Sequence, residues 1–159
     1  MLKTKDFNSY ISKKLSKIAK DIISSDKVDE NWFSSGTYNV NKVPIPIKHE
    51  VATQDGTVQT LEGKVDYKSG HHIITGPKGE KYPVSPAKFD SIYNDNKDGT
   101  ATPKKIIKKA KLADHDGTIQ TKWGKLDYKK GEHMIVRHGD NDYGPVRLDI
   151  FHQTYEKSE

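Results

Sequence analysis

The chain of 159 residues contains no cysteine, which excludes disulfides, thiolate zinc sites and cysteine nucleophiles. It also has no apolar run close to the roughly 18 residues that a membrane-spanning helix needs. The first 25 residues lack the uninterrupted apolar stretch of a secretory signal. We therefore expect a cytoplasmic protein without a transmembrane segment.

Arginine is scarce. Arg137 and Arg147 are the two arginines among 27 basic residues, which face 22 acidic ones and leave a formal net charge of +5. Lysine is a hydrated point charge, whereas arginine presents a planar fork that suits phosphates and base edges. The surplus therefore indicates solubility first and weak attraction for nucleic acids second.

Sequence motifs of known catalytic sites are missing as well. The chain has no G-x-S-x-G, P-loop or dinucleotide fingerprint, and no H-E-x-x-H zinc motif. We expect no cofactor, no metal and no catalytic residue. Enzymatic activity stays open at this point, and its absence is favoured.

The sequence does contain an amphipathic pattern near its start. Apolar residues between positions 7 and 23 recur every three or four residues, with lysines on the remaining surface, which predicts a helix. We expect its apolar face to pack on this same protein, with an anionic membrane or a partner's groove as alternatives. Trp32, Phe33 and Tyr38 follow, so residues 1–40 are predicted as a helix with an aromatic connector.

An internal duplication occupies the rest of the chain. Residues 55–60 (DGTVQT) match 116–121 (DGTIQT), and 63–68 (GKVDYK) match 124–129 (GKLDYK), at an offset of 61. At the same offset Gly70, His72 and Ile74 match Gly131, His133 and Ile135. Beyond an insertion that we place near Gly144, the offset becomes 62, with Phe89/Phe151 and Tyr93/Tyr155. Chance does not produce such agreement.

Each copy has the turn and strand signals of a β-meander. Asp-Gly and other glycine-containing turns separate short strands, the first predicted at 43–51 and at 105–112. Ser85 and Pro86 then start a short helix as its cap and first residue. We predict a mainly β (α+β) fold in which the helix is followed by two tandem, partly open barrel-like repeats. The repeats span 41–94 and 104–159, joined by a linker at 95–103.

Residues 70–93 (GHHIITGPKGEKYPVSPAKFDSIY) resemble the closing part of small phage and bacterial proteins named for a Pro-Gly-Asp-Tyr-Gly motif. The first copy carries Gly70, Ile74, Gly76, Gly79, Glu80, Tyr82, Pro83, Pro86, Phe89 and Tyr93 in that frame, and the second keeps Gly131, Ile135, Tyr143, Pro145, Phe151 and Tyr155. Both depart from the acidic-aromatic pair of the motif. The resemblance implies a β-rich domain of phage or mobile-element type and assigns no activity.

The favoured function is a non-enzymatic protein-binding module, such as an inhibitor or accessory factor that acts on a larger protein. Two similar units present two similar surfaces, which suits an unidentified protein partner. The predicted contact residues are polar and repeated around one turn: His71, His72, Glu132 and His133.

Two alternatives stay open. The first is binding of nucleic acid by a basic strand with an aromatic platform, formed by Lys104, Lys105, Lys108, Lys109, Lys111 and Trp123. On a strand these lysines would divide between two faces, which weakens a single phosphate-binding stripe. The second is a small-ligand or enzymatic site between the repeats.

Overall fold

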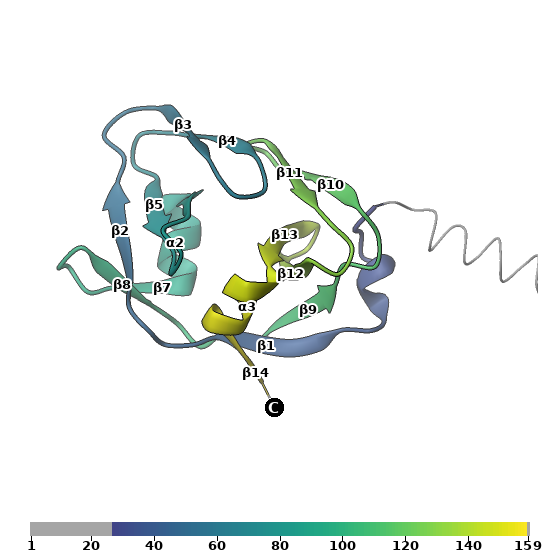
Figure 1. Ribbon diagram of the computed structural model, residues 1–159. Helices are drawn as coiled ribbons and strands as arrows, with labels where there is room; N and C mark the ends of the chain where they lie inside the picture. Colours follow the sequence, from purple (N-terminus) through teal and green to yellow (C-terminus); the bar gives the residue numbers. More distant parts are fainter. Residues whose placement is uncertain (1–26, 159) are drawn as a thin grey trace, which may run out of the picture.

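The computed structural model describes residues 27–158 and is mainly β (Figure 1). Within that range it has two five-stranded sheets and two two-stranded hairpins, and neither large sheet closes into a barrel. The helix predicted at 7–23 lies outside the described residues. None of the helices in the described part is long and apolar enough to cross a membrane.

The first copy forms the sheet β6-β5-β2-β8-β7. Its strands are β2 (Ile47–Val51), β5 (His72–Thr75), β6 (Lys81–Val84), β7 (Tyr93–Asp95) and β8 (Thr100–Pro103). The hairpin β3 (Gly56–Gln59)–β4 (Lys64–Tyr67) stands apart from that sheet, and helix α2 (Pro86–Ile92) follows β6.

The second copy forms the sheet β13-β12-β9-β1-β14. Its strands are β1 (Tyr38–Lys42), β9 (Lys108–Leu112), β12 (His133–Gly139), β13 (Asp142–Arg147) and β14 (Tyr155–Lys157). Its hairpin is β10 (Gly117–Gln120)–β11 (Lys125–Tyr128), its helix is α3 (Leu148–Thr154), and a 3₁₀ turn, Trp32–Ser34, precedes β1.

The two copies exchange their leading strands. β1 precedes the first copy in sequence, yet it pairs with β9 and β14 of the second, with Val40 opposite Lys157. β8 precedes the second copy and pairs with β2 and β7 of the first, with Ala101 opposite Asp95. Each sheet is therefore completed by a strand from the other copy's sequence. The exchange joins two units that are each so small that a separate hydrophobic core would be only marginally stable.

This exchange changes two sequence-based predictions. The segment 95–103, predicted as a linker, contains strand β8. The opening strands predicted at 43–51 and 105–112 begin later, at Ile47 and Lys108, because the residues before them cross from one sheet to the other. Pro44 and Pro46 also lack the N–H that a strand ladder uses.

The helices close both copies as predicted. The Ser85 hydroxyl accepts a hydrogen bond from the backbone N–H of Lys88 at 3.4 Å, and Pro86 is the first residue of α2. At the start of α3, Arg147 provides no side-chain cap, and its guanidinium pairs with Asp149 instead.

Backbone hydrogen bonds correct the predicted correspondence between the copies. The N–H of Ala52 donates to the carbonyl of His71, and the N–H of Ala113 donates to that of His133. His71 therefore corresponds to His133, which the sequence alignment had paired with His72. The extra residue of the second copy is Glu132, in the turn before β12, whereas the insertion was predicted near Gly144.

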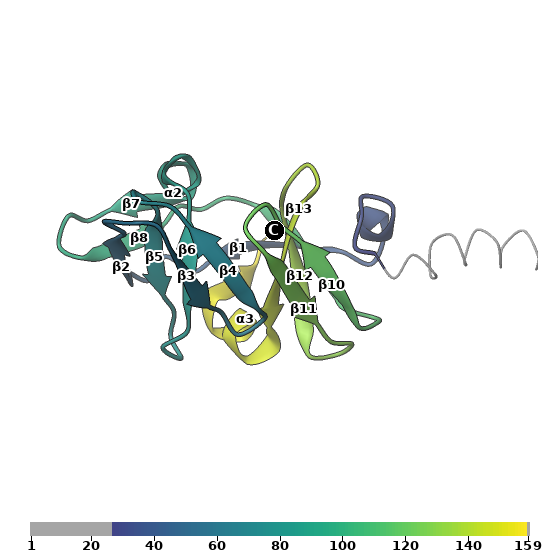
Figure 2. The ribbon, with the colours of Figure 1, turned by 90° about the horizontal axis from the view of Figure 1, so that it is seen from above.

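The two hairpins lie side by side above the sheets (Figures 1 and 2), and Val65 of β4 forms a bridge with Gly124, next to β11. Three buried clusters support this arrangement. One lies in the first copy around Ile74, Phe89 and Tyr93. The second copy has one on each face of its sheet, around Phe151 and Tyr155 and around Trp32 and Tyr128.

Candidate functional site

A cleft of about 980 Å³ lies between the two copies and is lined by residues of both. Much of its wall is apolar, with side chains such as Leu61, Val84, Ile92, Leu126 and Val146. Its charged lining is unbalanced, because seven basic residues face three acidic ones. The basic residues are Lys42, Lys48, Lys81, Lys88, Lys108, Lys122 and Arg147, and the acidic ones are Glu62, Glu80 and Asp142.

The seam between the hairpins forms one wall of the cleft. Asp66 donates its backbone N–H to the carbonyl of Trp123 at 2.9 Å, and Asp127 donates to that of Glu62 at 2.7 Å. The backbones approach so closely that a Cβ on Gly63 would lie 2.2 Å from the Lys125 carbonyl oxygen. Glycine at this position therefore permits the contact between the copies.

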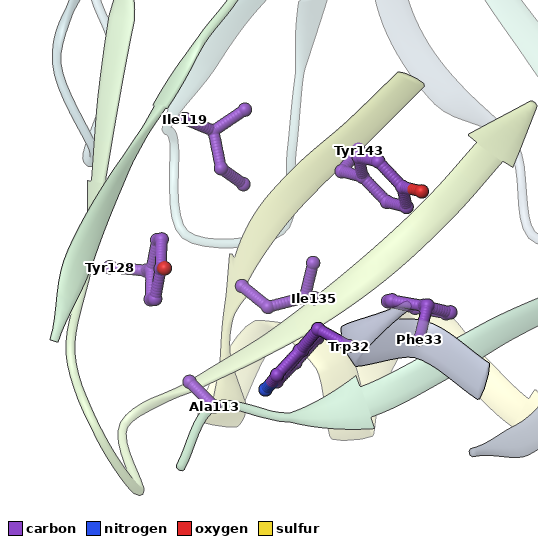
Figure 3. Close-up of a cluster of buried hydrophobic side chains, with 7 residues drawn as sticks. All are labelled: Trp32, Phe33, Ala113, Ile119, Tyr128, Ile135 and Tyr143. Carbon is purple, nitrogen blue, oxygen red and sulfur yellow. The ribbon is translucent and has the colours of Figure 1, made fainter. Parts of the chain in front are cut away.

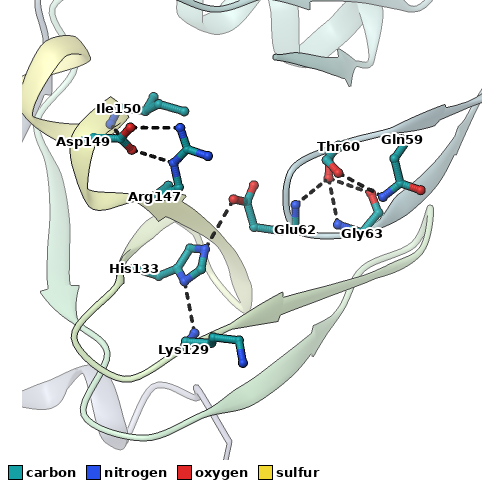
Figure 4. Close-up of polar contacts among 9 residues, drawn as sticks. All are labelled: Gln59, Thr60, Glu62, Gly63, Lys129, His133, Arg147, Asp149 and Ile150. Atoms are coloured by element: carbon teal, nitrogen blue, oxygen red, sulfur yellow. Dashed lines mark hydrogen bonds and ion pairs between the residues drawn. The ribbon is translucent and has the colours of Figure 1, made fainter. Parts of the chain in front are cut away.

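His133 lies across this seam (Figure 4). Its Nδ1 accepts a hydrogen bond from the backbone N–H of Lys129 at 3.0 Å, which leaves Nε2 to donate to the Glu62 carboxylate at 3.3 Å. The side chains of His133 and Glu62 are 13% and 14% exposed. This predicted contact residue therefore connects the two copies of the chain itself.

The other predicted partner-binding residues are dispersed. His71 is 6% exposed, and its ring meets Trp123 edge-on with the centroids 4.8 Å apart. His72 stacks on Phe89 at 3.6 Å. Glu132 is exposed in its turn. The three histidines thus face the interior at separate places and do not form one outer surface.

His72 also approaches His49, with 3.1 Å between their Nδ1 atoms, and His49 Nε2 lies 3.2 Å from the Asp95 carboxylate. Burial, together with His49, lowers the pKa of His72. Among residues 27–158 no group of three or more His, Cys, Asp or Glu side chains is placed to hold a metal ion.

Lys42 comes from the exchanged strand β1 and reaches into a group of tyrosines. Its Nζ donates to the Tyr93 hydroxyl at 2.7 Å and lies 5.1 to 5.8 Å from the ring centroids of Tyr82, Tyr93 and Tyr155. Burial opposes the charge, but the oxygens of Tyr93 and Tyr155 offset it and hold the pKa of Lys42 above its usual value. Lys42 thereby contacts both copies.

Lys108 and His138 form a second polar pair in the cleft. The Lys108 Nζ lies 3.0 Å from Nδ1 of His138. Burial, together with the charges of Lys42 and Lys88, lowers the pKa of Lys108 to about 8. Burial, together with the charges of Lys108, Lys88 and Lys42, keeps the pKa of His138 well below its usual value, so at neutral pH His138 is an uncharged acceptor.

Lys88 of α2 completes the basic group and bridges the copies through Asp142 of β13, at 3.1 Å. Asp142 is the carboxylate that opposes the lysine charges at Lys108. The centre of the cleft thus combines three ammonium groups, one neutral imidazole and three phenols.

The predicted nucleic-acid-binding residues do not form one stripe. Lys108 faces the cleft, and Lys111 turns inward, where its Nζ donates to the Trp32 carbonyl at 2.6 Å. Lys104 donates to the Asp90 carbonyl at 2.7 Å, and Lys105 and Lys109 are exposed. Trp123 is half-buried against His71.

Sequence reasoning missed Lys42, His138 and Tyr82 as parts of a site. The repeated Tyr93 and Tyr155 were a usable signal, because they are equivalent residues of the two copies and both lie near Lys42. Lys42 carried no comparable signal, since its place depends on the strand exchange. No protein-family model, curated protein or solved structure matches this chain. The resemblance to the Pro-Gly-Asp-Tyr-Gly proteins stays a prediction.

Proposed function

We propose that this protein binds a small anionic ligand with an apolar body in the cleft between its two copies. The observation that carries the proposal is the convergence of Lys42, Lys88 and Lys108 in a cleft of about 980 Å³, much of whose wall is apolar. A cavity of this volume accommodates a ligand the size of a typical cofactor or drug, and a few polar groups in an apolar wall are usual for such sites.

The mutual influence of the lysines supports an anion as the ligand. Besides burial, the charges of Lys42 and Lys88 disfavour the charge on Lys108, so the ammonium groups repel one another. A carboxylate, sulfonate or phosphate between them would relieve this repulsion and form charge-assisted hydrogen bonds. The apolar wall would then cover the rest of the ligand.

The protein-binding function expected from the sequence is less well supported. Three of its four contact residues face the interior, and Glu132 is the one that is exposed. Binding of a protein partner, and the inhibitor or accessory role, stay predictions. Binding of nucleic acid also stays a prediction. Its expected lysines are divided between the cleft and separate outer positions, which does not favour a single phosphate-binding stripe.

A fluorescence titration with 1-anilinonaphthalene-8-sulfonate, an anionic aromatic probe, tests the proposal. We expect saturable binding of one probe per chain, and much weaker binding of neutral dansylamide. Lys108→Gln should weaken sulfonate binding roughly tenfold, the loss expected for one charge-assisted hydrogen bond. Lys109→Gln is the matched control, because the adjacent Lys109 is exposed and does not line the cleft.

Equal affinity for the two probes would refute the requirement for an anion. Equal effects of the two substitutions would place the sulfonate outside the cleft. ¹H–¹⁵N NMR spectra recorded during the titration provide an independent check, since shifts should gather on residues of both copies around Lys42 and His138.

A further inference from the structure

We propose that Lys108 is a nucleophile that forms an imine with an anionic ligand carrying an aldehyde or ketone group. This inference rests on the proposed ligand site and adds a covalent step to it. The geometry behind it is the 3.0 Å contact between Lys108 Nζ and His138 Nδ1 at the wall of the cleft.

The surroundings of Lys108 differ from those of the other amines at the centre. Lys42 donates to a phenol that stabilises its ammonium form, and Lys88 is paired with a carboxylate. Lys108 has a neutral imidazole as its partner, which accepts a hydrogen bond but brings no negative charge to offset the ammonium. A desolvated amine next to other cations is the usual environment of a lysine that attacks carbonyl groups.

The protonation equilibrium agrees with this geometry. With a pKa lowered to about 8, Lys108 is neutral in a substantial fraction of molecules near pH 7.5. That fraction exceeds the one for an ordinary lysine by a factor on the order of 100. The charged and titratable groups around it are Lys42 on β1, Lys88 on α2, Asp142 on β13 and His138 on β12.

The step balances with the groups present. The neutral Lys108 amine adds its electron pair to the carbonyl carbon, and one of its two N–H protons passes to the carbonyl oxygen, which becomes the hydroxyl of a carbinolamine. His138 Nδ1, 3.0 Å from the nitrogen, is placed to relay that proton. The second N–H proton leaves with the hydroxyl as water, and the electron pair that it leaves behind forms the carbon–nitrogen double bond to Lys108. Lys42 and Lys88 would hold the ligand's anionic group during this sequence, and no oxidant or reductant is needed.

Reductive trapping tests the proposal on the full chain. The protein is incubated with 4-formylbenzoate and sodium cyanoborohydride, digested, and mapped by mass spectrometry. We expect a dominant single adduct on Lys108, formed at least tenfold faster than on the exposed Lys109, with a rate that rises through about pH 8. Neutral benzaldehyde should react with much less preference for Lys108. Adducts distributed over many lysines according to their exposure would overturn the proposal.

Lys108→Arg separates the covalent step from ligand binding. Arginine keeps the positive charge but does not form the imine, so the adduct should disappear while sulfonate binding persists. Lys109→Arg, the matched control, should leave both unchanged. The imine proposal would fail, while the ligand site stood, if the Lys108→Arg variant were labelled to the same total extent as the unsubstituted protein. Its adducts would then lie on other lysines. If the unsubstituted protein did not bind the sulfonate probe, the ligand site itself would be refuted.

His138→Gln tests the partner of Lys108. Glutamine retains a hydrogen-bonding side chain but takes up no proton in this range. We expect the adduct on Lys108 to form several-fold more slowly, with a changed pH profile, while sulfonate binding is retained. An unchanged rate and profile would remove His138 from the step.

Discussion

The hairpins of the two copies have nearly the same sequence but bury different residues. Tyr128 of the second hairpin is 1% exposed, whereas the corresponding Tyr67 is half-buried. The difference arises from the turn Trp32–Ser34, whose Trp32 and Phe33 pack on the second copy (Figure 3). Equivalent residues therefore acquire different energetic roles when a segment outside the repeat covers one copy.

A second difference lies under the helices. In the first copy His49 and His72 occupy the positions that Ala110 and Met134 hold in the second, as the strand pairing shows. The second copy buries its pair in an apolar cluster, whereas the first copy keeps a hydrogen-bonded histidine pair stacked on Phe89. The first copy should therefore respond to acid at this place and the second should not.

The largest effect is expected where the copies differ most in burial. Trp32→Ala should destabilise the protein by about 3 to 5 kcal/mol, because it removes a buried aromatic side chain and leaves a cavity. It also removes the hydrogen bond from Nε1 to the Asp114 carboxylate. Urea unfolding measures the loss, and Tyr67→Ala, at an aromatic residue that is only half-buried, should cost clearly less. Equal losses would show that the Trp32 turn does not distinguish the copies.

The seam between the hairpins should tolerate an added Cβ poorly at both of its glycines, Gly63 and Gly124. A Cβ on Gly124 would lie 2.5 Å from the Lys64 carbonyl oxygen, which mirrors the close approach at Gly63. Gly63→Ala and Gly124→Ala should each lower the free energy of unfolding by about 1 to 3 kcal/mol, since backbone must move. Gly139→Ala is the control, because a Cβ there meets nothing within 4 Å. Thermal unfolding of the three variants decides whether both glycines hold the copies together.

The helix starts differ in a smaller way. Ser85 caps α2, while the equivalent Arg147 pairs with Asp149 at the start of α3. Ser85→Ala should cost about 1 kcal/mol, as the loss of an N-cap usually does. Asp149→Ala, which introduces the residue found at position 87 of the first copy, should cost less because the ion pair is exposed. Chemical denaturation at low and high salt compares them, and only the Asp149 effect should shrink with salt.

The smallest effect concerns pH. The pKa of His72 is lowered in the folded protein by burial and by His49, so the unfolded chain takes up protons more readily. Stability contributed by the neutral form is therefore present above the unfolded pKa, near 6.5, and is lost as the pH falls below it. His72→Met, the residue of the second copy, should reduce this acid sensitivity.

Unfolding free energies of the His72→Met variant at pH 7.5 and pH 5 measure the change. His152→Gln, at an exposed histidine, should leave the pH dependence as it is. If His72→Met did the same, the histidine pair would have no part in the acid response.

The sequence was sufficient for features that depend on neighbouring residues. The duplication, the Asp-Gly turns and the Ser85-Pro86 helix start were predicted, because turn and cap preferences act over a few positions. The correspondence of His72 with His133 failed because one inserted residue, Glu132, is invisible in an alignment guided by identical letters. Backbone hydrogen bonds to His71 and His133 reveal it.

By itself, the sequence determined that this protein is a mainly β chain built from two copies of one unit, since alternating polarity and turn residues are local properties. Only the tertiary structure decided that the copies exchange β1 and β8, and that Lys42, Lys88, Lys108 and His138 meet in one cleft. The physical reason is that the backbone N–H and C=O groups of a strand can form hydrogen bonds with any neighbouring strand of suitable register. Whether β1 and β8 pair within their own copy or with the other copy therefore depends on how the two copies pack together.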